Sequence, residues 1–308
     1  MFSRTLDLTG RKLKLIPGDV CNQTDLEELW LDDNQINEIP EGLTQLIRLK
    51  RFSLYKNNLK AIPESFFSLR ELESINFSVN SLSSIPESVG NLSHLQILDL
   101  NHNALTEIPK SVGRLKNLRF LYLAGNGFQT LPQTLENLKK LIYLNISHGK
   151  LEVLPRCIAG MTDLIELRIY KNNIASIADW IGKLHTLKEI HAMNNQIATL
   201  PTSIGNLKSL RKLMLENNRL ESLPGNIGDL DSLTDLDLRG NRLTSLPETI
   251  GNLKSLRFLD LRDNRLKSLP TGIQNLTHLE KLDVRLNKGI IIPKWLQGLK
   301  DRGCTIFY

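Results

Sequence analysis

The residues best suited to chemistry in this chain form a group around one histidine. His191 follows Glu189 by two positions, Glu166 precedes Glu189 by 23, and Arg168 follows Glu166 by two. A histidine beside carboxylates has the composition of a general acid–base group. The group has no accompanying nucleophile and no sign of an enclosed pocket, so it favours polar recognition of a partner over catalysis.

Other catalytic and metal-binding signatures are missing from the sequence. Gly149-Lys150-Leu151 lacks the upstream glycine and the following hydroxyl residue of a phosphate-binding loop, and neither H-E-x-x-H nor C-x-x-C occurs. His102 and His148 share a repeat position, but two strand spacings would place them roughly 10 Å apart, too far to hold one metal ion. We therefore expect no catalytic residue, no metal site, no cofactor and no enzymatic activity.

The elements that position these side chains follow from a period of 23 residues. All twelve prolines lie on one 23-residue lattice from Pro17 to Pro293, and Ala178 occupies its one empty point. Leucines open successive copies at the same spacing, from Leu26 to Leu279. The chain is therefore one structural unit repeated about thirteen times.

Each copy predicts a short strand, a turn and a short helical segment. Residues 28–32 carry leucine at every second position, which indicates a strand with one buried face. Asn34 can satisfy backbone groups in the turn that follows, and Pro40 holds an extended backbone. Leu43 and Leu46 are three residues apart, as in a short helical segment. The constant connection length makes neighbouring strands parallel.

The pattern L-x-x-L-x-L-x-x-N-x-I over residues 26–36 resembles the leucine-rich repeat. The second half of the copy resembles its 23-residue intracellular type, which Ras-signalling scaffolds, plant relatives and many bacterial proteins share. Residues 290–308 are similar to the endings of bacterial members, including effectors of intracellular pathogens. The resemblance implies an α/β fold: a curved solenoid, or horseshoe, with a parallel concave sheet of about 13 strands and short helical segments on the convex side.

The unbroken period predicts a single domain over residues 1–308. We expect an N-terminal capping repeat at 1–25 and eleven regular repeats over 26–278. The last repeat and a C-terminal cap, which includes a final capping strand, should occupy 279–308.

Charge and cysteine content favour a cytoplasmic protein. The net charge of +6 comes from interleaved lysines, arginines and acids, so no nucleic-acid-binding stripe is expected. No apolar run is long enough to span a membrane, and Met1–Leu6 leaves no room for a signal peptide. Cys21 and Cys157 lie six copies apart, roughly 30 Å, so they cannot form a disulfide.

Function is expected on the strand positions that point away from the core, namely the third, fifth and seventh of each copy. Four of the five tyrosines lie there, with phenylalanine, tryptophan and methionine. Such side chains are enriched in protein-binding hot spots, although β-propensity also favours tyrosine on strands. The predicted partner-binding residues are Trp30, Tyr55, Phe120, Tyr122, Tyr143, Glu166, Arg168, Tyr170, Glu189, His191, Met193, Met214, Glu216, Arg239, Phe258 and Arg262.

The last copies carry two columns of opposite charge one strand apart. One column is aspartate and the other, two residues further along each strand, is arginine. A surface ladder that neutralises itself and a polar docking rim explain these columns about equally well. The members are Asp237, Asp260 and Asp283 with Arg239, Arg262 and Arg285.

These observations predict a non-enzymatic module, monomeric on its own, that binds a folded protein partner on its concave face. The bacterial resemblance suggests an effector or an effector's regulator that inhibits a partner enzyme by covering its active site, in the host cytosol if it is secreted. Two alternatives remain open. One is a signalling scaffold for a small GTPase or phosphatase, and the other is the recognition arm of a larger ubiquitin ligase or kinase.

Overall fold

The computed structural model describes residues 4–308, which form two compact units. The first unit comprises the chain up to Lys150 together with Pro155–Met161, and the second comprises Leu151–Leu154 with Thr162–Tyr308. The first three residues of the expected capping repeat, and with them the start of the segment judged too short for a signal peptide, lie outside the described residues. The expectation of a single domain stays a prediction.

In the first unit, seven three-residue strands pair in parallel in chain order, and each residue lies beside the one 23 positions later. The strands are β1 (Thr5–Asp7), β2 (Glu28–Trp30), β3 (Arg51–Ser53), β4 (Ser74–Asn76), β5 (Ile97–Asp99), β6 (Phe120–Tyr122) and β7 (Tyr143–Asn145). A 3-10 turn follows each strand. These turns are η1 (Gly18–Asn22), η2 (Glu41–Gln45), η3 (Glu64–Ser68), η4 (Glu87–Asn91), η5 (Lys110–Arg114), η6 (Gln133–Asn137) and η7 (Arg156–Gly160).

The second unit repeats this arrangement and adds a short helix before its last strand. Its strands are β8 (Glu166–Arg168), β9 (Glu189–His191), β10 (Lys212–Met214), β11 (Asp235–Asp237), β12 (Phe258–Asp260), β13 (Lys281–Asp283) and β14 (Thr305–Phe307). Its turns are η8 (Asp179–Lys183), η9 (Thr202–Asn206), η10 (Gly225–Asp229), η11 (Glu248–Asn252) and η12 (Thr271–Asn275), and its helix is α1 (Leu296–Asp301). Strand β14 pairs in parallel with β13, which confirms the expected final strand.

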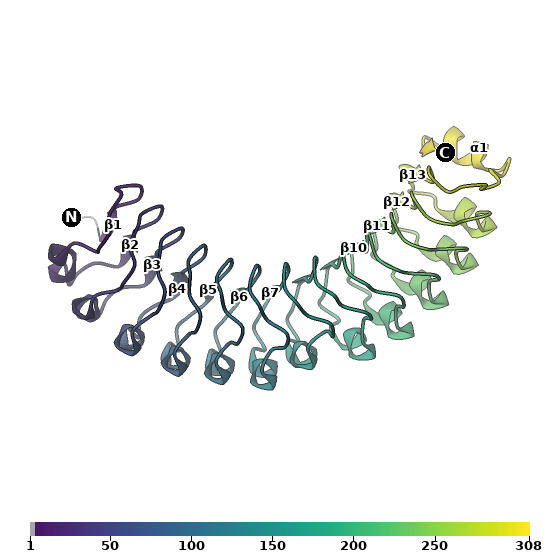
Figure 1. The fold of residues 1–308 in the computed structure, drawn as a ribbon. Helices are drawn as coiled ribbons and strands as arrows, with labels where there is room; N and C mark the ends of the chain where they lie inside the picture. The colour runs from purple at the N-terminus through teal and green to yellow at the C-terminus, as the bar shows by residue number, and fades with distance from the viewer. Residues whose placement is uncertain (1–3) are drawn as a thin grey trace. The chain divides into compact units, whose positions relative to one another are not determined.

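Alternation along each strand separates core from surface. In β6 the middle residue Leu121 is fully buried, whereas Phe120 and Tyr122 are half-buried on the opposite side of the strand. In each unit the strands line the inner side of the curve, and the 3-10 turns lie on the outer side (Figure 1). The predicted leucine-rich-repeat architecture is confirmed. The described residues contain fourteen strands because β14 adds one to the thirteen copies.

Asparagines after the strands hold neighbouring copies together. The amide nitrogen of Asn218 donates to the carbonyl oxygens of Ala192 (2.9 Å) and Leu215 (3.0 Å). Its Oδ1 accepts the backbone N–H of Ile197 at 3.0 Å. Such an amide satisfies backbone groups that the short strands leave unpaired inside the core. The two units divide at Lys150, next to Gly149, where glycine replaces this asparagine.

Ala178 keeps the backbone conformation of the prolines whose place it takes. Its φ and ψ are −79° and 152°, close to the −72° and 154° of Pro201 one copy later. In both copies the carbonyl oxygen of this residue accepts an N–H from the 3-10 turn that follows. The repeat geometry therefore determines the turn here even without the pyrrolidine ring.

Candidate functional site

The strand face is the set of side chains at the third, fifth and seventh positions of the copies, on the side opposite the leucine core. All of the predicted binding residues belong to it, and none of them is buried. Tyr55 and Phe258 are the most exposed apolar members, at 39% and 37%. The other predicted residues are half-buried, so part of each side chain is accessible to a partner while the rest packs against its neighbours.

The expectation that all three positions are displayed is wrong in several copies. Strands lie about 4.8 Å apart, so long side chains cover small or hydrogen-bonded neighbours. The buried members are Ser53, Ser78, Ala124, Asn145, Ser147, Asp237 and Asp283. The accessible surface therefore comprises fewer residues than their position in the repeat alone predicts.

In the first unit, three aromatic residues on β6 and β7 form an aromatic patch: Phe120, Tyr122 and Tyr143. The ring centroids of Tyr122 and Tyr143 are 4.8 Å apart, and those of Phe120 and Tyr143 are 6.4 Å apart. Both distances fall in the range of favourable aromatic pairs. Trp30 on β2 and Tyr55 after β3 belong to earlier copies and are separate from this patch by strand order.

Asp99 on β5 adjoins the aromatic patch, since it pairs in register with Tyr122 on β6. Burial raises the pKa of Asp99 to about 6, and the backbone N–H of Asn101, donated to its Oδ1 at 2.9 Å, only partly offsets this. Sequence reasoning did not single out Asp99. The signal was present, because the aspartates of the last copies are each followed two residues later by arginine, whereas Asp99 is followed by Asn101.

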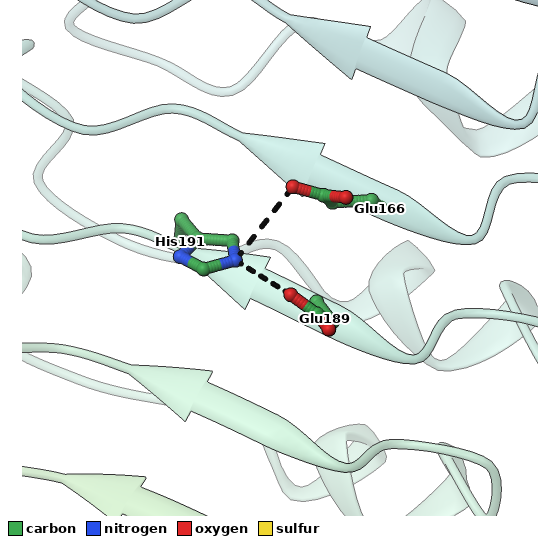
Figure 2. Close-up of side chains that lie close together, drawn as sticks. All are labelled: Glu166, Glu189 and His191. Atoms are coloured by element: carbon green, nitrogen blue, oxygen red, sulfur yellow. Dashed lines mark hydrogen bonds and ion pairs between the residues drawn. The ribbon is translucent and has the colours of Figure 1, made fainter.

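In the second unit, the histidine group predicted from the sequence does come together. Figure 2 shows His191 and Glu189 from β9 beside Glu166 from β8. His191 Nε2 lies 2.9 Å from Glu189 Oε2 and 3.8 Å from Glu166 Oε1. All three side chains are half-buried, so the group is a fixed part of the surface.

Basic side chains complete this polar network. Arg168 Nε donates to Glu166 Oε1, and Lys212 Nζ lies 3.0 Å from Glu189 Oε1. Burial opposes ionisation of Glu189, but the hydrogen bonds from His191 and Lys212 outweigh it and lower the pKa of this carboxyl. The network is thus close to neutral and rich in fixed donors and acceptors.

Glu166, Glu189 and His191 are also the residues that could hold a metal ion. Their candidate ligand atoms lie within 4.8 Å of one another, and within residues 4–308 no other group of three or more has this property. The cationic groups of Arg168 and Lys212 already occupy the carboxylates, so an ion would have to displace them. The arrangement suits polar recognition better than metal binding.

The acidic and basic columns of the last copies pair as expected. Arg262 Nη2 lies 2.5 Å from Asp260 Oδ2, and Arg285 Nη2 lies 2.6 Å from Asp283 Oδ2. Arg239 differs, because its Nη2 is shared between Asp237, at 3.2 Å, and Glu216. The neutralisation of the columns is therefore weakest at Asp237.

The separation expected for His102 and His148 was wrong. Their ring centroids are 6.3 Å apart, whereas two strand spacings would give about 10 Å. Gly125 has the equivalent position in the intervening copy, where a Cβ would lie 2.3 Å from His102 Nδ1. The missing side chain gives the imidazoles room to approach across the strand between them. In the described part of the chain, no carboxylate or thiol joins them as a third metal ligand.

The fold and the strand face define a repeat protein of the leucine-rich type, and the family comparison agrees. The sequence matches the model for the leucine-rich repeat region over residues 110–199 and 226–301, and that for the leucine rich repeat over 24–82 and 78–128. The chain belongs to the leucine-rich-repeat family. This fold is a protein–protein interaction module. No curated protein sequence matched the chain.

Solved structures include bacterial and plant proteins of the same fold. A leucine-rich-repeat protein of Leptospira interrogans is 28% identical with a TM-score of 0.66, over 99% of this chain and 95% of that one. The plant peptide hormone receptor RGFR1, in complex with RGF2, is 31% identical with a TM-score of 0.81, over 92% of this chain but 47% of the receptor chain. An internalin of Listeria monocytogenes shares the fold at 21% identity and a TM-score of 0.72, over 93% of this chain and 88% of that one.

The helices of the structure are short. Within residues 4–308, none has the length and apolar character needed to cross a membrane.

Proposed function

We propose that this protein is a non-enzymatic module that binds a folded protein partner through its strand face. The observation that carries this proposal is the aromatic patch, in which Phe120, Tyr122 and Tyr143 are clustered and half-exposed. Accessible aromatic side chains on a rigid sheet lose little entropy on binding and supply much of the energy at protein interfaces. The polar network around His191 would add specificity by its fixed charges.

The finer role we propose is that of a bacterial effector, or an effector's regulator, that inhibits a partner enzyme by covering its active site. The similarity to the Leptospira interrogans protein over nearly the whole of both chains supports a bacterial setting. We place this role in the cytoplasm, or in the host cytosol if the protein is secreted. The three cysteines are free and buried, as is usual in a reducing compartment.

A second candidate function is a signalling scaffold for a small GTPase or phosphatase that holds two partners at once. The observation that favours it is the chemical contrast between the units: the first carries the aromatic patch and the second carries the polar network. A ternary complex detected by mass photometry would support the scaffold. Mutually exclusive binding of the two partners would leave the single-partner role.

The test is affinity capture with a variant that replaces Tyr122 by Asn and Tyr143 by Ser. Both substitutions copy residues that other copies carry at the same positions, Asn76 and Ser74, so folding should be preserved. We expect the affinity for the principal captured protein to fall at least about thirtyfold, because the loss of even one aromatic anchor costs roughly 2 kcal/mol. Calorimetry with the purified partner measures the dissociation constant.

The matched control is Trp180→Ser, which removes a half-buried aromatic residue from turn η8 on the opposite side. Ser111 has the equivalent position in another copy, so this change also respects the repeat. The control should keep its affinity. A strand-face variant that binds as tightly as the unmodified protein, or a control that loses binding equally, would overturn the proposal.

A further inference from the structure

A small pocket lies on the strand face of the second unit, among strands β10 to β13. Its cavity volume is about 230 Å³, below the roughly 300–1,000 Å³ of sites for drug-sized molecules. A pocket of this size suits a single amino-acid side chain. The lining residues that matter are Met214, Asp235, Asp237, Phe258, Asp260 and Lys281.

Carboxylates outnumber ammonium groups in this pocket by three to one. Asp260 is held by Arg262, but Asp237 shares Nη2 of Arg239 with Glu216. Asp235 accepts a hydrogen bond from Thr234 Oγ1 at 2.6 Å and, in the part of the chain that the structure describes, has no ion-pair partner within 4.0 Å. The pocket therefore keeps an excess of negative charge.

The lysine of the pocket does not remove this excess. Lys281 Nζ lies 5.5 Å from the ring centroid of Phe307 on β14, and none of the ion pairs within residues 4–308 joins it to a pocket aspartate. Burial raises the pKa of Asp237, and the carboxylates of Asp260 and Glu216 raise it further, against the lowering by Arg239. In contrast, the bonds from Arg285 to buried Asp283 outweigh its burial and lower its pKa.

The walls of the pocket are apolar. Phe258 is 37% exposed on β12, and Met214 is half-buried on β10. A long basic side chain can pack its methylene groups on such walls while its charged end reaches the carboxylates. The ring of Phe258 already receives one guanidinium, since Arg257 Cζ lies 5.2 Å from its centroid.

The spacing of the carboxylates distinguishes arginine from lysine. Asp237 and Asp260 lie side by side in register on β11 and β12, so their Cα atoms are about 4.8 Å apart. A planar guanidinium has five N–H donors and can bond both carboxylates at once, whereas an ammonium is a point charge.

Building on the proposed protein-binding function, we propose that this pocket receives an arginine side chain of the partner.

The probe for this site is a blocked pentapeptide, Gly-Gly-Arg-Gly-Gly, compared with the same peptide carrying citrulline, which has the same shape without the charge. Titration is followed by the amide NMR signals of residues on β11 and β12. We expect saturable shifts with the arginine peptide and shifts at least about tenfold weaker in affinity with citrulline.

Asp237→Asn tests the residue that the proposal depends on most. Asn145 occupies the equivalent position and its Oδ1 accepts the N–H two residues later, as Asp237 Oδ1 does for Arg239, so the variant should fold. We expect roughly tenfold weaker peptide binding. Asp260→Asn provides a second variant should the first unfold. Glu221→Gln, an exposed carboxylate of the same unit that does not line the pocket, should bind normally.

Three results would overturn the arginine assignment. The citrulline peptide could cause equal shifts, Asp237→Asn and Asp260→Asn could bind undiminished, or calcium chloride alone could reproduce the shifts at micromolar concentration, which would indicate a cation site. These outcomes are independent of the capture experiment. If partner capture depends on Tyr122 and Tyr143 but the peptide does not bind, the arginine site fails and the protein-binding function stands.

Discussion

Asp99 is an acidic residue whose environment disfavours its charge. Its pKa is raised from 3.8 to about 6, chiefly by burial. The folded state therefore binds more protons than the unfolded state between about pH 4 and 6, and stability falls as the pH rises through that window. Above about pH 6, the free-energy cost of ionising Asp99 in the folded state no longer changes with pH.

Replacing Asp99 by Asn should remove this cost. We expect the variant to be more stable than the unmodified protein by about 1–3 kcal/mol at pH 8 and equally stable near pH 4. Asn76 has the same position one copy earlier and accepts the same kind of backbone N–H, at 2.9 Å. Urea unfolding at both pH values gives the comparison.

Asp283→Asn is the matched control for that pH dependence. The pKa of Asp283 is lowered, because hydrogen bonds and charge from Arg285, with the charge of Arg262, outweigh its burial. Its ionised form therefore stabilises the folded state above the unfolded pKa, and the variant should be less stable at pH 8. A gain at pH 8 in both variants would contradict the assignment for Asp99.

Asn218 is an example of the buried asparagines that hold neighbouring copies together. Asn218→Ala would leave carbonyl oxygens of Ala192 and Leu215 and the N–H of Ile197 without partners in the core. We expect a loss of about 2–4 kcal/mol in the free energy of unfolding, measured by urea denaturation. Exposed Asn173, directly after another such asparagine, is the control, and its change to alanine should cost less than about 0.5 kcal/mol. Equal losses would argue against the hydrogen-bond explanation.

Among the elements, turn η8 is the one that begins without proline. Ala178 already has proline-like φ and ψ, and among the described residues no acceptor is found for its backbone N–H. Ala178→Pro should therefore stabilise the protein by about 0.4–1 kcal/mol, by restricting the unfolded chain. A rise in melting temperature is the expected readout.

The control at this scale is Ala198→Pro. The N–H of Ala198 donates to the carbonyl oxygen of Ala175 at 3.0 Å, so proline would remove a bond between neighbouring copies. This variant should melt at a lower temperature. The two alanine-to-proline changes should have opposite signs, and the same sign for both would contradict the role given to the backbone at Ala178.

At the scale of the whole molecule, the three cysteines report on the integrity of the fold. Cys21 and Cys157 belong to the first unit and Cys304 to the second, and all three are buried. Burial raises the pKa of each thiol, in the case of Cys157 to about 12. At pH 8 we expect slow reaction with a disulfide reagent in the native protein and rapid labelling of all three in guanidinium. Fast labelling of the native protein would contradict the packing described.

Much of the fold was predictable because the same pattern of apolar residues recurs in every copy. One copy's alternation, such as that around Leu121, identifies the core side of every strand, and the constant spacing makes the register 23 throughout. The candidate site was less predictable. Position alone placed the binding residues on one face, but it did not show that Ser53 and Asn145 on that face are buried.

Contacts between side chains of neighbouring copies depend on what lies between them. His102 and His148 approach each other because Gly125, which lies between them, has no side chain. The pKa of Asp99 is raised whereas that of Asp283 is lowered, because Asn101 is neutral and Arg285 carries a positive charge. The sequence contains each of these residues, but their effect depends on side-chain conformations that a repeat pattern does not specify.

The sequence by itself determined the repeat, the parallel strands, the leucine core and the face on which the variable residues stand, because a short period constrains the backbone at every copy. Only the tertiary structure decided how closely those residues meet, in the aromatic patch, in the network around His191 and in the acidic pocket at Asp237. The physical reason is that burial and charge at a strand position are set by the neighbouring copies, 23 residues away on either side.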